Sequence, residues 1–293
     1  MIMDLWHKIH DHYKGDPGKI TLLTIVMLVV SDLPLYAFTL LDILKLPQLY
    51  KYRLHYAKDV AGHLGNRVYP PMSVIKEAAR NGEFNFIFGY VIPGYLAIKA
   101  ANKLKIFVYD TEREVSWLRV IKETIAISLL ADVCFYLVHR VVHRPGLYQF
   151  FHKKHHEFKY SMAMAHHYME YHEALMFALP QALPPMMLMP FFGRMHILSM
   201  WFGMFFTQFG AIVGHSGYNF LGPLLPDWFP FFRAAYHDFH HVDYSVNFGA
   251  NFEFTDKLFG TFMRAPLANV EEAVKRLGTD KAYDYARQAI SLS

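Results

Sequence analysis

His139-Arg-Val-Val-His143, His152-Lys-Lys-His155-His156 and His237-Asp-Phe-His240-His241 are three histidine groups within one stretch of the chain. Of its 18 histidines, 13 lie between residues 139 and 241. A buried imidazole needs a partner for its ring nitrogens, so this density is costly in an apolar chain. A metal centre supplies many such partners at once, and the stretch therefore predicts a metal site.

The spacing inside each group places imidazoles side by side. His139 and His143 are four residues apart, so a helix presents both on one face. In the second group, His152 shares a helix face with either His155 or His156, and the adjacent histidine turns towards a second ion. The third group repeats this geometry. Neutral imidazole binds iron, zinc, copper or nickel. Because the three groups offer more imidazoles than one ion can bind, they predict a dimetal site.

Other catalytic signatures are missing from the sequence. His172-Glu173 lacks the second histidine of an HExxH zinc motif, and there is no P-loop, GxGxxG or GxSxG motif. Cys134 is the only cysteine, which excludes a disulfide within the chain and a CxxC site.

The composition indicates an integral membrane protein. Hydrophobic residues make up 54% of the chain and charged residues 18%, against about 25% charged residues in soluble domains. The net charge of +4 is modest. Since no dense Lys/Arg patch occurs, we expect no nucleic-acid partner.

Several apolar runs are long enough, or nearly so, to cross a bilayer. They cover residues 20–44, 84–101, 118–138, 174–192 and 196–213. The basic connector 45–83 predicts a cytosolic side, and counting the crossings then places all histidine groups on that side. We expect an all-α integral membrane helical bundle of about four to five apolar segments, with a cytosol-facing helical cap that holds the histidine-rich dimetal site.

Four segments of the sequence carry a family resemblance. They are Asp132-Val-Cys-Phe-Tyr-Leu-Val-His139-Arg-Val-Val-His143, His152-Lys-Lys-His155-His156-Glu157, His215-Ser-Gly-Tyr218 and His237-Asp-Phe-His240-His241. They resemble the membrane-bound fatty acid hydroxylase/sterol desaturase superfamily of histidine-box di-iron oxygenases. The His215-Ser-Gly-Tyr218 element and the third group most resemble the C4-methylsterol monooxygenase branch.

The resemblance implies a multi-pass enzyme of the endoplasmic reticulum membrane whose metal site faces the cytosol. It implies two iron ions, which zinc can replace, and O2 as co-substrate. Electrons from NAD(P)H arrive through an external carrier, a cytochrome b5-type donor with its reductase. The implied reaction is hydroxylation of an unactivated C–H bond in a membrane lipid, such as a 4-methylsterol. The charge and apolar pattern along the chain predicts a polar N-terminal leader (1–19), N-terminal spans with the basic connector (20–117), a histidine-box hydroxylase domain (118–265) and a solvated C-terminal helix (266–293).

Ten histidines are the expected metal ligands: His139, His143, His152, His155, His156, His172, His215, His237, His240 and His241. For the ligand between the second and third groups, both His167 and His172 are candidates. His172 is favoured because it lies immediately before an apolar run. Asp132, Asp238 and Asp256 are expected to orient imidazole N–H groups from behind the ligands. His166 and His196 are expected to be structural.

Alternative functions remain open at this point. One is a fatty acyl or other sterol hydroxylase or desaturase of the same superfamily, or a relative that cleaves a long-chain aldehyde. Another is a non-catalytic membrane metal-binding protein or transporter. A transporter would place its histidines near the bilayer midplane, whereas here they cluster at the ends of the apolar runs, which favours an enzyme.

Overall fold

The computed structural model describes residues 2–13, 16–54, 69–103, 109–158, 161–220, 234–241 and 243–263. Most of these residues are helical. The α-helices are α1 (Ile2–Tyr13), α2 (Pro17–Ser31), α3 (Leu33–Leu44), α4 (Met72–Asn85), α5 (Ile92–Lys103), α6 (Trp117–Val142), α7 (Leu147–Phe151), α8 (Tyr171–Ala182), α9 (Pro184–Phe192), α10 (Ile197–Ser216), α11 (Ala234–His240) and α12 (Phe254–Phe259). The shorter elements are the 3-10 helices η1 (Pro47–Tyr52) and η3 (Ala163–His167), the π-helix η2 (Phe86–Val91) and the strands β1 (Tyr109–Asp110) and β2 (Met195–His196). The expected C-terminal helix 266–293 lies outside the described residues.

Four helical segments are long and apolar enough to cross a membrane, and they confirm the expected all-α membrane bundle. They are Gly18–Leu44, Trp117–Val142, Tyr171–Phe192 and Ile197–Ser216. The expected run 84–101 is not one of the four; it lies in the continuous column formed by α4, η2 and α5. The protein is therefore a multi-pass membrane protein.

Local sequence explains where these helices begin and break. Asp16 caps α2 through its carboxylate, which accepts the backbone N–H groups of Gly18 and Lys19, and Pro17 opens the helix. The apolar segment Gly18–Leu44 is divided at Asp32, between α2 and α3. Pro34 removes a backbone donor there. Ser116 caps α6 in the same way as Asp16 caps α2.

Large apolar side chains cover the outside of the bundle. Leu22 of α2, Leu118 of α6 and Phe191 of α9 expose 62%, 64% and 83% of their surface. In water such a surface is unfavourable, whereas lipid tails accept it. The outward faces of these helices therefore fit contact with a bilayer.

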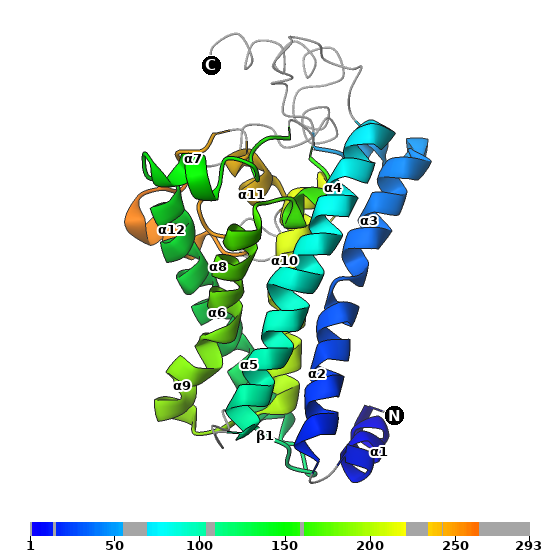
Figure 1. Cartoon of the computed structure of the whole chain (residues 1–293), viewed down its shortest axis with the longest axis vertical. Helices are drawn as coiled ribbons and strands as arrows, with labels where there is room; N and C mark the ends of the chain where they lie inside the picture. The colour runs from blue at the N-terminus through cyan, green and yellow to red at the C-terminus, as the bar shows by residue number, and fades with distance from the viewer. Residues whose placement is uncertain are drawn as a thin grey trace.

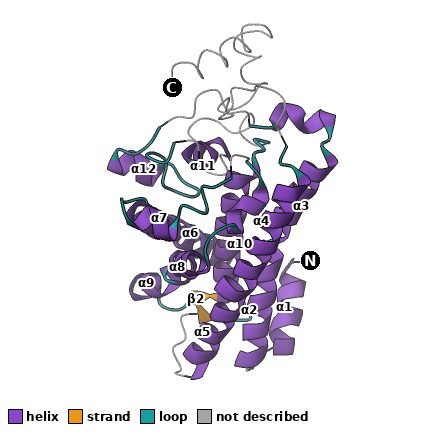
Figure 2. Ribbon diagram, turned by 45° about the horizontal axis from the view of Figure 1, so that its top comes forward, coloured by secondary structure: helices purple, strands orange, loops and turns teal. Residues whose placement is uncertain are grey.

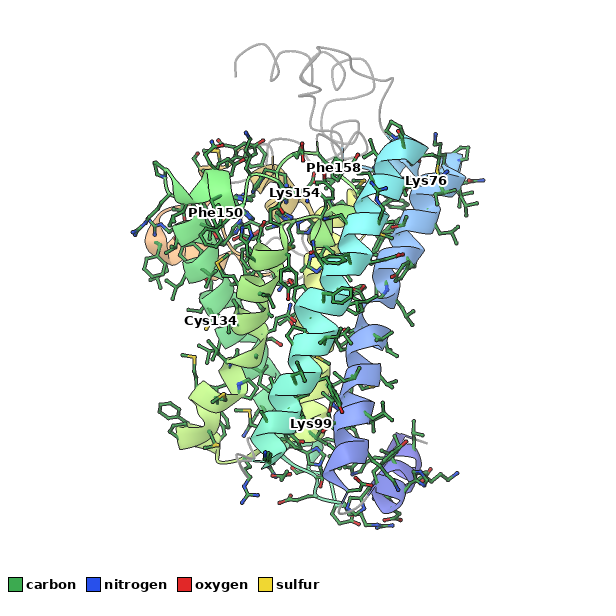
Figure 3. The ribbon with its side chains drawn as sticks, viewed as in Figure 1. Lys76, Lys99, Cys134, Phe150, Lys154 and Phe158 are labelled. Atoms are coloured by element: carbon green, nitrogen blue, oxygen red, sulfur yellow. The ribbon has the colours of Figure 1, made fainter. Side chains whose placement is uncertain are left out.

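The long helices run alternately up and down, so that every second chain reversal lies at the same end (Figure 1). The short helices α7, α11 and α12 gather at one end, whereas β1 and β2 lie towards the other (Figures 1 and 2). Lys154 and Phe158 lie at the first end and Lys99 near the opposite one (Figure 3). We call these the histidine end and the strand end, since all three histidine groups belong to segments at the first.

The strand end is closed by a short parallel pairing of β1 with β2, in which Asp110 lies opposite His196. Arg119 of α6 binds three carboxylates there, those of Asp110 at 2.6 Å, Glu112 at 3.1 Å and Glu123 at 2.7 Å. Trp6 of α1 is buried beside His196, with ring centroids 5.1 Å apart. The leader expected to be merely polar thus supplies a helix that packs on this end.

Candidate metal centre

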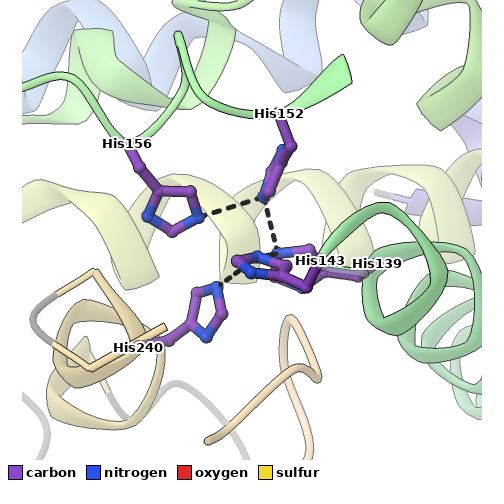
Figure 4. Close-up of side chains that lie close together, drawn as sticks. All are labelled: His139, His143, His152, His156 and His240. Carbon is purple, nitrogen blue, oxygen red and sulfur yellow. Dashed lines mark hydrogen bonds between the residues drawn. The ribbon is translucent and has the colours of Figure 1, made fainter. Parts of the chain in front are cut away.

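The histidine end brings nine imidazoles into two groups. Within each group, the candidate ligand atoms all lie within 4.8 Å of one another. The five-histidine group consists of His139, His143, His152, His156 and His240 (Figure 4). The four-histidine group consists of His155, His215, His237 and His241. All nine belong to the ten expected ligands, so residues more than a hundred positions apart in sequence meet as predicted.

The division between the groups answers the question that spacing left open. His152 shares its group with His156, four residues on, while His155 turns to the other group. His237 and His241 repeat this pairing, and His240 crosses to the five-histidine group. Each three-histidine motif therefore contributes to both groups and ties them together.

Five imidazoles form a hydrogen bond between Nδ1 and a backbone carbonyl. Because a carbonyl can only accept, the Nδ1 of each imidazole must carry the proton. The histidine donates and the carbonyl accepts in each of these pairs: His139 and Phe248 (2.6 Å), His240 and Val246 (2.6 Å), His237 and Gly249 (3.1 Å), His155 and Tyr168 (3.2 Å), and His215 and Ala211 (2.8 Å). Their Nε2 atoms therefore present lone pairs. This is the tautomer in which imidazole binds a metal through Nε2.

Facing lone pairs are the clearest sign that these imidazoles bind a cation. In the five-histidine group the Nε2 atoms of His139 and His152 are 2.8 Å apart, and in the four-histidine group those of His155 and His215 are 3.0 Å apart. The Nδ1 of His152 faces the Glu173 carboxylate, so in both pairs neither Nε2 has a proton to donate. Nitrogens bound at right angles to an ion at about 2.1 Å are about 3 Å apart. The donor set and its spacing therefore fit one ion per group.

Burial keeps these imidazoles neutral. It lowers the pKa of His143 to about 3, of His155 to about 3 and of His237 to about 4. The buried Nε2 atoms of His237 and His241 have no hydrogen-bond partner among the described residues. Unpartnered buried nitrogens are costly, and bound metal removes that cost.

Two of the three expected acids act on the backbone rather than on imidazoles. Asp256 accepts the backbone N–H groups of Phe248 and Gly249, at 2.9 and 2.8 Å. Asp132 accepts those of Ala250 and Asn251, at 3.2 and 2.7 Å. They hold the loop 246–251, and the carbonyls of that loop orient three imidazoles. We expected these acids to contact the imidazoles directly, but Asp132 and Asp256 orient them only through the loop.

Asp238 faces away from the imidazoles in the described structure. Its carboxyl pairs with the Ser161 side chain and lies near Arg53, while burial raises its pKa to about 7. Arg53 is itself fully buried, binds Asp42 and donates to the carbonyls of Ser161 and Ser216, at 2.6 and 3.3 Å. This cluster fixes the end of α10, where His215 lies.

His172 is the expected ligand that the structure does not bring to either group. Its Nε2 lies 2.9 Å from the Phe150 carbonyl, and its ring stacks on Phe150 with centroids 4.5 Å apart. The alternative, His167, is also elsewhere, because its Nε2 lies 2.9 Å from Asp32 Oδ1. Position before an apolar run was a poor guide, since the first turn of α8 points this side chain outward.

Glu173, the neighbour of His172, is the orienting acid that sequence reasoning missed. It is completely buried, and its carboxylate accepts the Nδ1–H of His152. A carboxylate at the start of an apolar helix needs a partner, and that cost was the signal. His196, expected to be structural, lies at the strand end, where its Nε2 donates to the Glu112 carbonyl at 3.0 Å.

A largely apolar cavity adjoins both groups, between α6, α8 and α10. Its apolar lining includes Phe135, Met169, Phe177, Pro180 and Ala211. Polar side chains of Gln181, Thr207 and Asn251 also border it, and it reaches His152 and His155. The candidate metal centre thus adjoins a largely apolar space.

The chain is similar to known membrane enzymes over part of its length. Residues 124–261 match the fatty acid hydroxylase family. Methylsterol monooxygenase 1 of Rattus norvegicus is 28% identical over 172 residues, 58% of this chain and 56% of the relative. Methylsterol monooxygenase 1-2 of Arabidopsis thaliana is 29% identical over 170 residues, 55% of each chain.

A relative of different function matches the same part of the chain. Very-long-chain aldehyde decarbonylase GL1-10 of Oryza sativa subsp. japonica is 32% identical over 138 residues, 45% of this chain and 44% of the relative. The chain thus spans about half the length of these relatives. No solved structure gives a significant match.

Proposed function

We propose that the protein hydroxylates an unactivated C–H bond of a membrane lipid with O2 at two iron ions, because residues 124–261 match the fatty acid hydroxylase family. The observation that carries the proposal is the pair of imidazole groups with facing Nε2 lone pairs. Imidazole-rich sites bind iron, and zinc can take the same place.

The chain's own residues hold and orient this centre. When bound, the iron pair supplies the reduction of O2 by two external electrons, so that one oxygen atom is inserted into the C–H bond and the other leaves as water. The two histidine groups hold the ions, and Glu173 and the loop 246–251 fix the imidazole tautomers. Phe135 and Phe177 line the cavity, where they exclude water and hold an apolar substrate.

A sterol is the substrate that the relatives favour. Two of the similar proteins are methylsterol monooxygenases, and His215-Ser-Gly-Tyr218 resembles that branch. We propose a 4-methylsterol, oxidised at its methyl group.

The histidine end faces the cytosol in this proposal, within the endoplasmic reticulum membrane. Arg140, Arg144 and Lys153 are exposed at this end, in keeping with the excess of positive charge on cytosolic segments. The same charges suit docking of an acidic electron carrier. We propose a separate cytochrome b5-type donor, fed from NAD(P)H by its reductase.

A second candidate is cleavage of a long-chain aldehyde. It is favoured by the match to a very-long-chain aldehyde decarbonylase. The same histidine groups serve either reaction, and the products differ: an oxidised sterol in one case and a shortened hydrocarbon in the other.

The test is turnover by the purified protein in lipid nanodiscs with iron, a reductant and isotopically labelled O2. Label in a 4-methyl-oxidised sterol supports the proposal, and a hydrocarbon from a long-chain aldehyde supports the second candidate. Bound metal without turnover of sterol, acyl lipid or aldehyde would indicate a non-catalytic metal-binding protein. Cells without the protein should accumulate 4-methylsterols.

A further inference from the structure

His166 of η3 is a buried histidine that lines the cavity. It exposes only 8% of its surface, and its Nε2 is buried without a hydrogen-bond partner among the described residues. Leaving such a nitrogen unpaired is unfavourable. The fold therefore maintains it for a reason other than packing.

The position of His166 points to the four-histidine group. Its ring centroid is 5.3 Å from that of His215, close to the 5.0 Å between His155 and His215 inside the group. It also lines the cavity together with His155, His215 and His237. His166 thus borders both the four-histidine group and the cavity.

A buried polar network lies next to His166 and is built on its neighbour His167. The Nε2 of Gln208 in α10 lies 3.3 Å from the Nε2 of His167 and donates to Asp32 Oδ1 at 2.8 Å. Asp32 also binds His167, whose ring centroid is 4.4 Å from that of His166. Neighbouring histidines of one short helix therefore have different surroundings: His167 is paired with an acid, and His166 faces the cavity.

The two histidine groups are unequal, with five and four imidazoles. We propose that His166 is the tenth imidazole ligand, which binds the ion of the four-histidine group from the cavity side. This inference rests on the proposed metal centre and names a ligand that neither histidine spacing nor the family resemblance selects. It gives both ions five imidazoles each and places the second ion next to the bound lipid.

The test compares His166→Gln and His166→Ala with two matched controls, His167→Gln in the same short helix and His172→Gln outside both groups. Each protein is loaded with cobalt in nanodiscs, and the loss of its ions to a chelator is followed. In the His166 variants one of the two ions should leave at least about 10-fold faster, because loss of a ligand should cost no less than loss of a group behind a ligand. The visible cobalt absorption should strengthen, because four-coordinate cobalt absorbs more strongly than five-coordinate cobalt. Both controls should match the wild type in the rate of ion loss and in cobalt absorption.

Chelation rates and spectra equal to those of the wild type in both His166 variants would overturn the inference and leave the dimetal centre intact. A wild-type protein that binds no metal would instead overturn the proposed function. A faster loss of metal in His167→Gln, with His166→Gln unchanged, would assign the effect to packing of the short helix and also contradict the inference.

Discussion

The two ends of the bundle both collect buried polar side chains, but they satisfy them differently. At the strand end charged and ring groups meet complementary partners: Arg119 meets carboxylates, and both ring nitrogens of His196 are hydrogen-bonded, Nδ1 to the Leu198 N–H and Nε2 to the Glu112 carbonyl. At the histidine end imidazoles meet one another, and the Nε2 atoms of His237 and His241 have no partner among the described residues. A satisfied cluster holds helices together, whereas a convergent, unsatisfied one binds a ligand.

The largest expected contrast between the ends comes from removing one imidazole at each. His152→Ala should cost at least about 100-fold in lipid oxidation, since it removes a ligand, an effect larger than the 10- to 100-fold typical of groups behind the ligands. It should also lower the metal content of the purified protein. His196→Gln should lower only the unfolding temperature. Equal metal loss in both variants would remove the distinction between the ends.

Acid should weaken the metal-free histidine end. The pKa values of His143 and His155 are lowered to about 3 and that of His237 to about 4, whereas unfolded histidine titrates near 6.5. Below about pH 6.5 the unfolded chain therefore takes up protons that the folded chain refuses, and stability falls as the pH drops towards about 4. Thermal unfolding of the metal-free protein in nanodiscs measures this. A midpoint that rises on acidification would contradict it.

The next contrast is between Glu173, buried at the histidine end, and Glu123, buried at the strand end. Glu173→Gln weakens the charge-assisted hydrogen bond to His152 and should lower metal affinity by about 10- to 100-fold. His172→Gln, one residue away and outside both groups, should leave the affinity unchanged. Metal titration by calorimetry or competition gives both values. An unchanged affinity in Glu173→Gln would show that Glu173 does not tune its imidazole.

Glu123→Gln should have the smallest effect, and it should change stability rather than metal binding. Glu123 accepts from the Ser199 hydroxyl at 2.6 Å, the His196 backbone N–H at 2.9 Å and Arg119 at 2.7 Å. Loss of its charge should lower stability by about 1–3 kcal/mol with no change in bound metal. Denaturation in detergent with parallel elemental analysis tests this. Metal loss at unchanged stability would reverse the roles of the two ends.

The sequence allows the bundle and most of the candidate site to be predicted, because both depend on local patterns. Apolar length marks four crossing helices, and histidine spacing brings nine imidazoles to one end. Spacing alone cannot decide whether His155 or His156 accompanies His152, since both steps fall on one helix face. Only the turn after α7 and the approach of α11 make that choice.

The remaining errors concern groups placed by tertiary contacts. His172 and Glu173 are adjacent, yet the acid points inward to His152 and the histidine outward to Phe150. Asp132 and Asp256 reach the imidazoles only through the loop 246–251. The position of that loop depends on contacts between residues far apart in sequence, and no periodicity encodes it.

Metal analysis of the protein purified from iron-supplemented cells tests the central claim most directly. Two ions per chain are expected, one for each histidine group. Substitution of His139 and His152 together should leave the four-histidine group able to bind its ion. A wild-type protein that retains no more than one ion per chain, or binds its metal equally well without these histidines, would contradict the dimetal centre.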